Sequence, residues 1–175
     1  MTDPTSRVQL RTTGPDDTRA IAAAVSAVLR PGDVVALSGE LGAGKTCFVQ
    51  GAASGLGVAA PITSPTFVLV RQYLDGRIPL VHCDVYRLDA LRDVLDLGDE
   101  VLAPDVVTFI EWGDAVRALL PDDRLEVELR HADPATGTVE DPDAPRLIEL
   151  HPRGQVLDRL SDLRSAVADW ITETR

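Results

Sequence analysis

The chain has 175 residues, a length that predicts one domain over residues 1–175. Its composition, 45% hydrophobic and 26% charged, is that of an ordinary globular protein and excludes collagenous, low-complexity and wholly disordered chains. The formal net charge of −11 argues against binding of nucleic acid by the chain alone, because an acidic surface repels phosphate backbones.

The first part of the chain is predicted to alternate strands with helices. A short strand over residues 8–11 precedes a helix that begins at residues 16–18 and ends at Pro31-Gly32. The apolar run over residues 33–38 is typical of a buried parallel strand. A glycine-rich loop separates this strand from a helix over residues 45–56.

The middle of the chain predicts a hairpin, because strands over residues 67–73 and 79–84 flank the turn signal Asp75-Gly76. The elements expected after it are a helix over 89–97, a strand over 106–110, a short helix over 114–120 and antiparallel strands over 124–130 and 146–151, joined by a mobile loop over 132–145.

The chain is expected to end in a helix over residues 155–172. Apolar residues recur at steps of four and three and form one stripe: Val156, Leu160, Leu163, Val167 and Trp170. We expect this stripe to pack on the sheet. A docking face for a partner is the alternative, and the exposure of Trp170 would separate the two.

The N-terminus lacks the apolar region of a signal peptide, and no apolar run approaches the roughly 20 residues of a membrane helix. The two cysteines, Cys47 and Cys83, have no zinc-site spacing and cannot form a disulfide framework. We therefore expect a cytoplasmic protein that does not contact a membrane.

Residues 39–46, GELGAGKT, match the phosphate-binding pattern G-x-x-x-x-G-K-[ST] between an apolar strand and a helix. Glycines let successive backbone N–H groups converge on phosphates, and the helix N-terminus adds its positive dipole end. Lys45, the only lysine among seventeen basic residues, would reach the β and γ phosphates. Thr46 would offer its hydroxyl to Mg²⁺. These residues predict a nucleoside triphosphate site.

The motif and the order of elements together predict an α/β fold. We expect a P-loop NTPase-like three-layer sandwich, with a central, mostly parallel sheet and antiparallel edge strands. The chain contains no asparagine and no second lysine, so it cannot form the Asn-Lys-x-Asp motif of guanine-specific relatives. ATP is therefore the expected nucleotide.

A phosphate loop needs an acidic partner at the end of a neighbouring strand to hold Mg²⁺ and to position the attacking group. Asp84 and Glu111 each end an apolar strand. Glu111 ranks first for magnesium, whereas Asp84 has a strong alternative as a turn cap. His82 shares a strand face with Asp84, and a hydrogen-bonded packing role suits it better than metal binding.

Two features leave alternatives open. Residues 64–67, Ser-Pro-Thr-Phe, form either a turn that starts a strand or a switch-type loop that senses the γ phosphate. Arg87 could contact the γ phosphate, or it could pair with Asp84 or Asp89.

Four segments together resemble the bacterial TsaE family, also called YjeE. They are GELGAGKT at 39–46, TSPTF at 63–67, HCDVYRL at 82–88 and IEWGD at 110–114, and the resemblance covers roughly residues 8–130. It implies a small ATPase of tRNA threonylcarbamoyladenosine biosynthesis that uses ATP and Mg²⁺. It also implies two partner proteins, TsaD and TsaB, weak activity without them, and contact with tRNA only through their complex.

The resemblance also implies roles for single residues. Lys45, Asp84 and Glu111 would be catalytic, and Thr46 and Glu111 would hold Mg²⁺. The residues implied to contact the nucleotide are Thr12, Gly42, Ala43, Gly44, Lys45, Thr46, Cys47, Thr66 and Trp112, with Thr12 against the base and Thr66 in the switch loop. Cys47 stands where many relatives have a second threonine.

Two other classes compete with this interpretation. A small-molecule kinase would need a basic lid, but residues 84–123 hold eleven acidic residues and three arginines. A nucleotide-dependent binding module without turnover is the other alternative.

Overall fold

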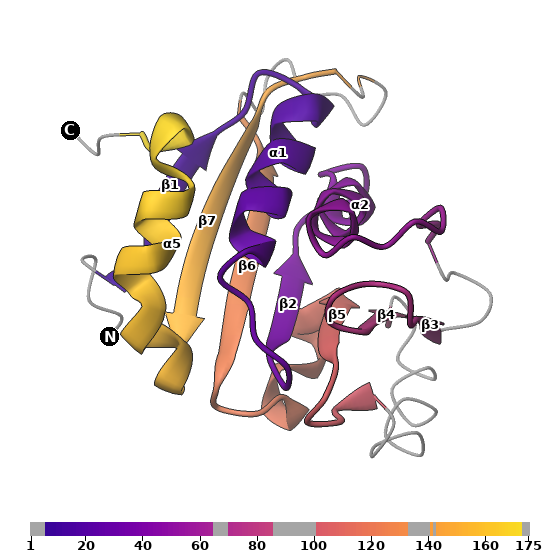
Figure 1. Ribbon diagram of the computed structural model, residues 1–175. Helices are drawn as coiled ribbons and strands as arrows, with labels where there is room; N and C mark the ends of the chain where they lie inside the picture. The colour runs from indigo at the N-terminus through magenta and orange to yellow at the C-terminus, as the bar shows by residue number, and fades with distance from the viewer. Residues whose placement is uncertain (1–5, 65–69, 86–100, 133–140, 142, 173–175) are drawn as a thin grey trace.

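A computed structural model describes residues 6–64, 70–85, 101–132, 141 and 143–172 (Figure 1). All strands described belong to one seven-stranded sheet in the order β1-β7-β6-β2-β5-β4-β3. The strands are β1 (Val8–Arg11), β2 (Val34–Ser38), β3 (Val70–Tyr73), β4 (Leu80–Asp84), β5 (Val107–Glu111), β6 (Arg124–His131) and β7 (Arg146–Arg153). The helices are α1 (Pro15–Ser26), α2 (Lys45–Gly55) and α5 (Leu160–Ala166), with 3-10 helices η2 (Gly113–Leu119), η3 (Gly154–Arg159) and η4 (Ala168–Trp170).

The sheet has a parallel centre and antiparallel margins, as predicted. Strand β2 pairs in parallel with β5 and with β6, and β5 pairs in parallel with β4. The antiparallel pairs are β3 with β4 and the run β1-β7-β6 at the other edge. The predicted hairpin around Asp75-Gly76 is therefore confirmed. Since β2 is buried over Val34–Leu37, the strand that leads into the phosphate loop is anchored in the middle of the molecule.

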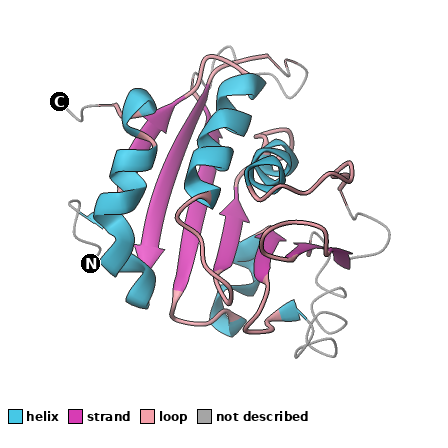
Figure 2. Ribbon diagram, in the orientation of Figure 1, coloured by secondary structure: helices cyan, strands magenta, loops and turns pink. Residues whose placement is uncertain are grey.

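Helices α1, α2 and α5 cover one side of the sheet, and the main hydrophobic core lies between these helices and the sheet (Figure 2). Helices α1 and α2 cross closely because glycines of α2 face α1. A Cβ at Gly51 would lie 2.3 Å from the carbonyl oxygen of Arg19, and one at Gly55 would lie 2.7 Å from that of Ala23. This close crossing fixes α2, whose first turn completes the phosphate loop.

The other side of the sheet is covered in part. Beside β2, β4 and β5, a second apolar cluster includes Val116 of η2 and Val101. On this side of the sheet, strands β6 and β7 instead carry alternating charged residues, as is common for antiparallel strands.

Glu126 of β6 belongs to these charged residues. Burial acts to raise its pKa, but hydrogen bonds from Arg124 and the charges of Arg117, Arg124 and Arg153 lower the pKa overall.

The C-terminal segment differs from the single helix predicted over residues 155–172, because it forms three short pieces, η3, α5 and η4. The backbone leaves helical geometry at Arg159, with φ −101° and ψ 14°. The guanidinium of Arg159 is held there by Asp33, at 2.7 Å through two nitrogens, and by the carbonyl of Val28 at 2.9 Å. This buried anchor competes with a continuous helix.

The apolar stripe of this segment nevertheless packs on the sheet, as expected. Val156, Leu163 and Val167 are buried in the main core, and Leu160 and Trp170 pack against it. The helix predicted over 114–120 is present as the 3-10 helix η2. The helix expected over 89–97, residues 67–69 of the third strand and most of the loop over 132–145 lie outside the described residues. Among the helices described, none has the length and apolarity that crossing a membrane requires.

Candidate functional site

The glycine-rich loop connects the end of β2 to the first turn of α2 and depends on glycine at two positions. Gly39 has φ +142°, and a Cβ there would lie 2.3 Å from the carbonyl oxygen of Leu129. Gly44 precedes α2 with φ +104°, in the left-handed region that side chains rarely adopt. The loop therefore turns its backbone into the N-terminus of α2, where unpaired N–H groups favour an anion.

Lys45 folds back over this loop. Its Nζ donates to the carbonyl oxygens of Gly39 at 2.7 Å and Glu40 at 2.9 Å, and it lies 3.7 Å from the centroid of the Trp112 ring. Burial lowers the pKa of Lys45, and the nearby Glu111 and other carboxylates partly offset this effect. The ammonium thus lies in a largely water-excluded position at the mouth of the loop.

Two carboxylates meet beside the lysine because their strands end at the same edge. Asp84 ends β4 and Glu111 ends β5, and the two residues are direct neighbours in the parallel register. Both are buried, with exposed fractions of 6% and 4%. Asp84 Oδ2 accepts a hydrogen bond from the hydroxyl of Ser64 at 3.0 Å.

Glu111 connects three elements through one oxygen. Its Oε1 accepts a hydrogen bond from the hydroxyl of Thr46 in α2 at 2.7 Å, and it lies 2.9 Å from Nε2 of His82 in β4. A hydroxyl beside an ionisable carboxylate is a pair of hard oxygen donors, which suits Mg²⁺. Thr46 and Glu111 thus fit the magnesium site predicted from the sequence.

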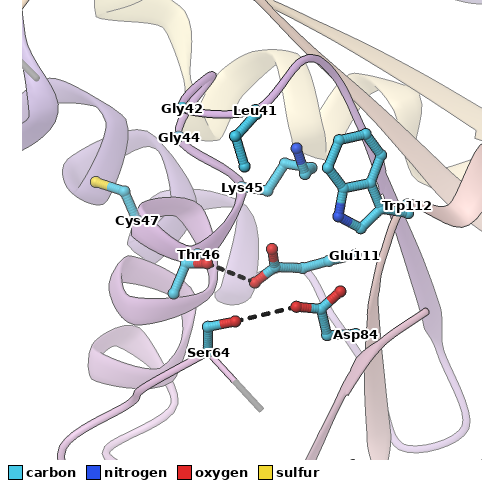
Figure 3. A pocket seen from close by; sticks show the side chains of 10 residues that line it. All are labelled: Leu41, Gly42, Gly44, Lys45, Thr46, Cys47, Ser64, Asp84, Glu111 and Trp112. Carbon is cyan, nitrogen blue, oxygen red and sulfur yellow. Dashed lines mark hydrogen bonds between the residues drawn. The ribbon is translucent and has the colours of Figure 1, made fainter. Parts of the chain in front are cut away.

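Trp112 directly follows Glu111 and turns the chain sharply out of the sheet. It has φ 62°, the only positive φ of a non-glycine residue among those described. The turn brings Gly113 against β2, where a Cβ would lie 2.7 Å from the Cβ of Ala36. The indole is thereby held over Lys45 (Figure 3).

These side chains surround a cavity of about 500 Å³ (Figure 3). Its lining consists of Leu41, Gly42, Gly44, Lys45, Thr46, Cys47, Ser64, Asp84, Glu111 and Trp112. Most residues implied by the family resemblance therefore come together in one place. Ala43 is buried beneath the loop, with its N–H donated to the carbonyl of Glu40 at 3.1 Å. Thr66 lies outside the described residues.

A second cavity, of about 380 Å³, lies on the other side of the loop. It shares Gly42, Gly44 and Cys47 with the first and adds Pro15, Thr18, Arg19, Asp143, Ala144 and Arg146. The Cys47 thiol points away from the carboxylates and donates to the carbonyl of Pro15 at 3.4 Å (Figure 3). Burial raises the pKa of this thiol.

The structure does not bring Thr12 into either cavity. Its side chain is fully buried, and its hydroxyl accepts the backbone N–H of Arg146 at 2.9 Å. Arg146 itself was not singled out by the sequence. Its guanidinium donates to the carbonyl of Gly42 at 3.3 Å and so links β7 to the phosphate loop. The sequence around Arg146 does not predict this contact, because the contact joins segments about a hundred residues apart.

Comparisons with known proteins agree on one family. The family model described as "Threonylcarbamoyl adenosine biosynthesis protein TsaE" matches residues 12–138. A protein of Bacillus subtilis named "tRNA threonylcarbamoyladenosine biosynthesis protein TsaE" is 41% identical over 126 residues, which are 72% of this chain and 79% of that protein. A protein of the same name from Treponema pallidum is 47% identical over 115 residues, 65% of this chain and 84% of its own length.

The fold extends this similarity to the C-terminal segment. The crystal structure of Bacillus subtilis YdiB superposes with a TM-score of 0.72 at 33% sequence identity, covering 93% of this chain and 95% of that one. Because the family model ends at residue 138, most of the segment that follows it shares the architecture of that protein as well.

Proposed function

Because the chain belongs to the TsaE family of threonylcarbamoyl adenosine biosynthesis proteins, we propose that it binds and hydrolyses ATP to support the formation of threonylcarbamoyladenosine in tRNA. One observation carries the proposal: the phosphate loop, its lysine and two strand-end carboxylates line a single cavity. This combination offers charge for phosphates and oxygen ligands for a divalent cation in the same space.

The phosphates would lie in the cavity against the loop. The N-terminus of α2 offers backbone N–H groups, and Lys45 brings an ammonium that is already oriented by the carbonyls of Gly39 and Glu40. Gly42 and Gly44 have no side chains to keep a phosphate from the backbone. Lys45 would thus stabilise the charge that builds up on the phosphates during transfer.

Thr46 and Glu111 would hold Mg²⁺ through their oxygens, and the phosphates would complete its ligand set. Bound there, the ion would polarise the phosphate oxygens and neutralise developing charge. Asp84 is the other carboxylate that lines the cavity, and its Oδ2 accepts a hydrogen bond from the hydroxyl of Ser64. We assign to Asp84 the role of orienting the attacking water, from which its carboxylate would accept a hydrogen bond.

The nucleoside would occupy the second cavity, across the loop from the carboxylates. Cys47 lines both cavities, so the backbone around it would pass close to the part of the nucleotide that joins base and phosphates. Arg146 offers a flat cation there, which favours an aromatic base. Thr12 would support this pocket indirectly, by fixing the backbone of Arg146.

The partners in this proposal are a TsaD-like and a TsaB-like protein in the cytoplasm, with ATP turnover weak until they bind. The formal charge of −11 supports indirect contact with tRNA, since an acidic chain gains little from phosphate contacts. Thr66 stays a prediction for the segment that responds to the γ phosphate.

The test measures phosphate release from ATP by the purified chain, alone and with both partners. We expect release to rise when the partners are added and to fall by about a hundredfold or more in the complex that carries Glu111→Gln. Co-purification of the partners in ATP and in ADP would show whether the nucleotide controls assembly. ADP formation that depends on a small-molecule acceptor, without partners, would contradict the proposal and favour a kinase.

A further inference from the structure

His82 is a fully buried side chain at the floor of the site. It lies in β4 between Leu80 and Asp84, on the side of the sheet that α2 covers, and its exposed fraction is 0%. Its Nε2 is 2.9 Å from Oε1 of Glu111. Its other ring nitrogen, Nδ1, is buried without a hydrogen-bond partner. Within the described part of the chain, the contact with Glu111 is therefore the one hydrogen bond that orients this ring.

The chemistry of the pair defines its direction. A carboxylate that binds Mg²⁺ is ionised and can only accept hydrogen bonds, so the Nε2–H group of His82 must be the donor in this bond. A neutral ring then leaves Nδ1 as a bare acceptor inside the core. Leaving a buried polar atom unpaired is unfavourable, and an apolar side chain at this position would avoid that cost.

The hydrogen bonds that His82 and Thr46 make to Glu111 come from different elements of the fold. Both donors meet Oε1 of Glu111, but Thr46 comes from the first turn of α2 whereas His82 comes from the neighbouring strand. If Thr46 turns its oxygen towards a metal ion, His82 still holds the carboxylate from the sheet. A hydrogen bond that persists in this way fixes the rotamer of a metal ligand.

We propose that His82 is a positioning residue for Glu111, which it orients for magnesium binding through its Nε2–H. This inference rests on the proposed role of Glu111 as a magnesium ligand. It assigns to His82 a function beyond filling the core, and it predicts that the reach of the side chain towards Oε1 matters more than its volume.

Two amide variants separate these roles. The side-chain nitrogen of Gln ends near the position of Nε2 and can donate to Glu111, whereas that of Asn ends near Nδ1 and falls short. The readout is the ratio of ADP dissociation constants in EDTA and in excess Mg²⁺, measured by calorimetry. We expect this ratio to fall by about tenfold or more in His82→Asn, the range seen when a ligand-orienting partner is lost. ADP binding in EDTA should stay within about threefold, and His82→Gln should keep most of the magnesium effect.

The controls distinguish the two proposals. Glu111→Gln should abolish the magnesium effect, and if it does not, the magnesium assignment fails whatever His82 does. A normal magnesium effect in His82→Asn, or an equal loss in both amide variants, would overturn the role of His82. Nitrogen-15 NMR of the wild-type histidines tests the same point without a variant, because a proton on Nδ1 instead of Nε2 would exclude donation to Glu111.

Discussion

Replacing Lys45 by methionine tests the phosphate site most directly. Methionine keeps most of the buried stem of the side chain and removes only the ammonium. In the free chain, that ammonium uses two of its three N–H groups on the carbonyls of Gly39 and Glu40. The third N–H and the positive charge are what a phosphate would gain.

The magnitude follows from these contacts. A hydrogen bond to a charged group contributes about 1.5–3 kcal/mol, and the ammonium attracts a second phosphate in addition. Lys45→Met should therefore cost about 3 kcal/mol of nucleotide binding, or roughly a 150-fold increase in the Kd for ATP. The free energy of unfolding should change much less than the affinity for ATP. Burial lowers the pKa of Lys45, which means that the fold disfavours the charged form, and methionine removes this unfavourable contribution.

The assay combines calorimetry with thermal unfolding. We expect weak ATP binding by a variant whose unfolding free energy lies within about 1 kcal/mol of the wild type, because water can reach the carbonyl of the exposed Glu40. Lys45 is the only lysine of the chain, so labelling with an amine-reactive reagent reports on it almost alone. ATP should slow this labelling. A Kd within threefold of the wild type in a folded variant would refute the assignment of Lys45 to the phosphates.

Three further predictions concern thiols, the C-terminal segment and acid stability. Burial raises the pKa of Cys83 to about 12 and also raises that of Cys47, so iodoacetamide at pH 8 should modify Cys83 only after unfolding and Cys47 slowly. MgADP should slow the labelling of Cys47 further, and rapid labelling of both native thiols would contradict this prediction. Arg159→Met should lower the unfolding free energy by about 3 kcal/mol in urea titrations, because it leaves the half-buried carboxylate of Asp33 without its ion pair. A loss below about 1 kcal/mol would show that water replaces the pair. The pKa of Glu126 is lowered in the fold, so its ion pairs stabilise the protein at pH values above the ordinary pKa of 4.5, and this stabilisation is lost as the pH falls through the folded pKa. Glu126→Gln should flatten the dependence of the urea midpoint on pH in this range, and an unchanged slope would count against the prediction.

The part of the site that follows the order of the chain could be predicted from the sequence. The phosphate loop is a continuous motif, and Asp84 and Glu111 each end an apolar strand. Carboxyl ends of parallel strands meet at one edge of a sheet, so both residues were expected near the loop, and the register places them side by side. The parallel centre of the sheet followed from the same apolar runs.

Features that depend on contacts between distant segments could not be predicted. The sequence places His82 and Asp84 on one strand face, but only the pairing of β4 with β5 shows that His82 reaches Glu111. Arg146 reaches Gly42 through the return of β7 beside the loop. The apolar stripe of the last segment was predicted correctly, whereas its helical continuity was not, because the ion pair of Arg159 with Asp33 is invisible to periodicity.

The charges that line the main cavity suggest that triphosphate binding needs a divalent cation, which the phosphate-loop motif alone does not indicate. Among the described residues that line it, Lys45 is the one cation, and it faces the two carboxylates Asp84 and Glu111. A triphosphate entering this space meets a net negative lining within a chain of formal charge −11. The helix dipole and the loop N–H groups offset only part of that repulsion. A divalent cation held by Thr46 and Glu111 would reverse the sign of the lining, so binding of the triphosphate and of the metal should reinforce each other. We therefore propose that the buried carboxylates, which look unfavourable for a phosphate site, make ATP binding dependent on magnesium.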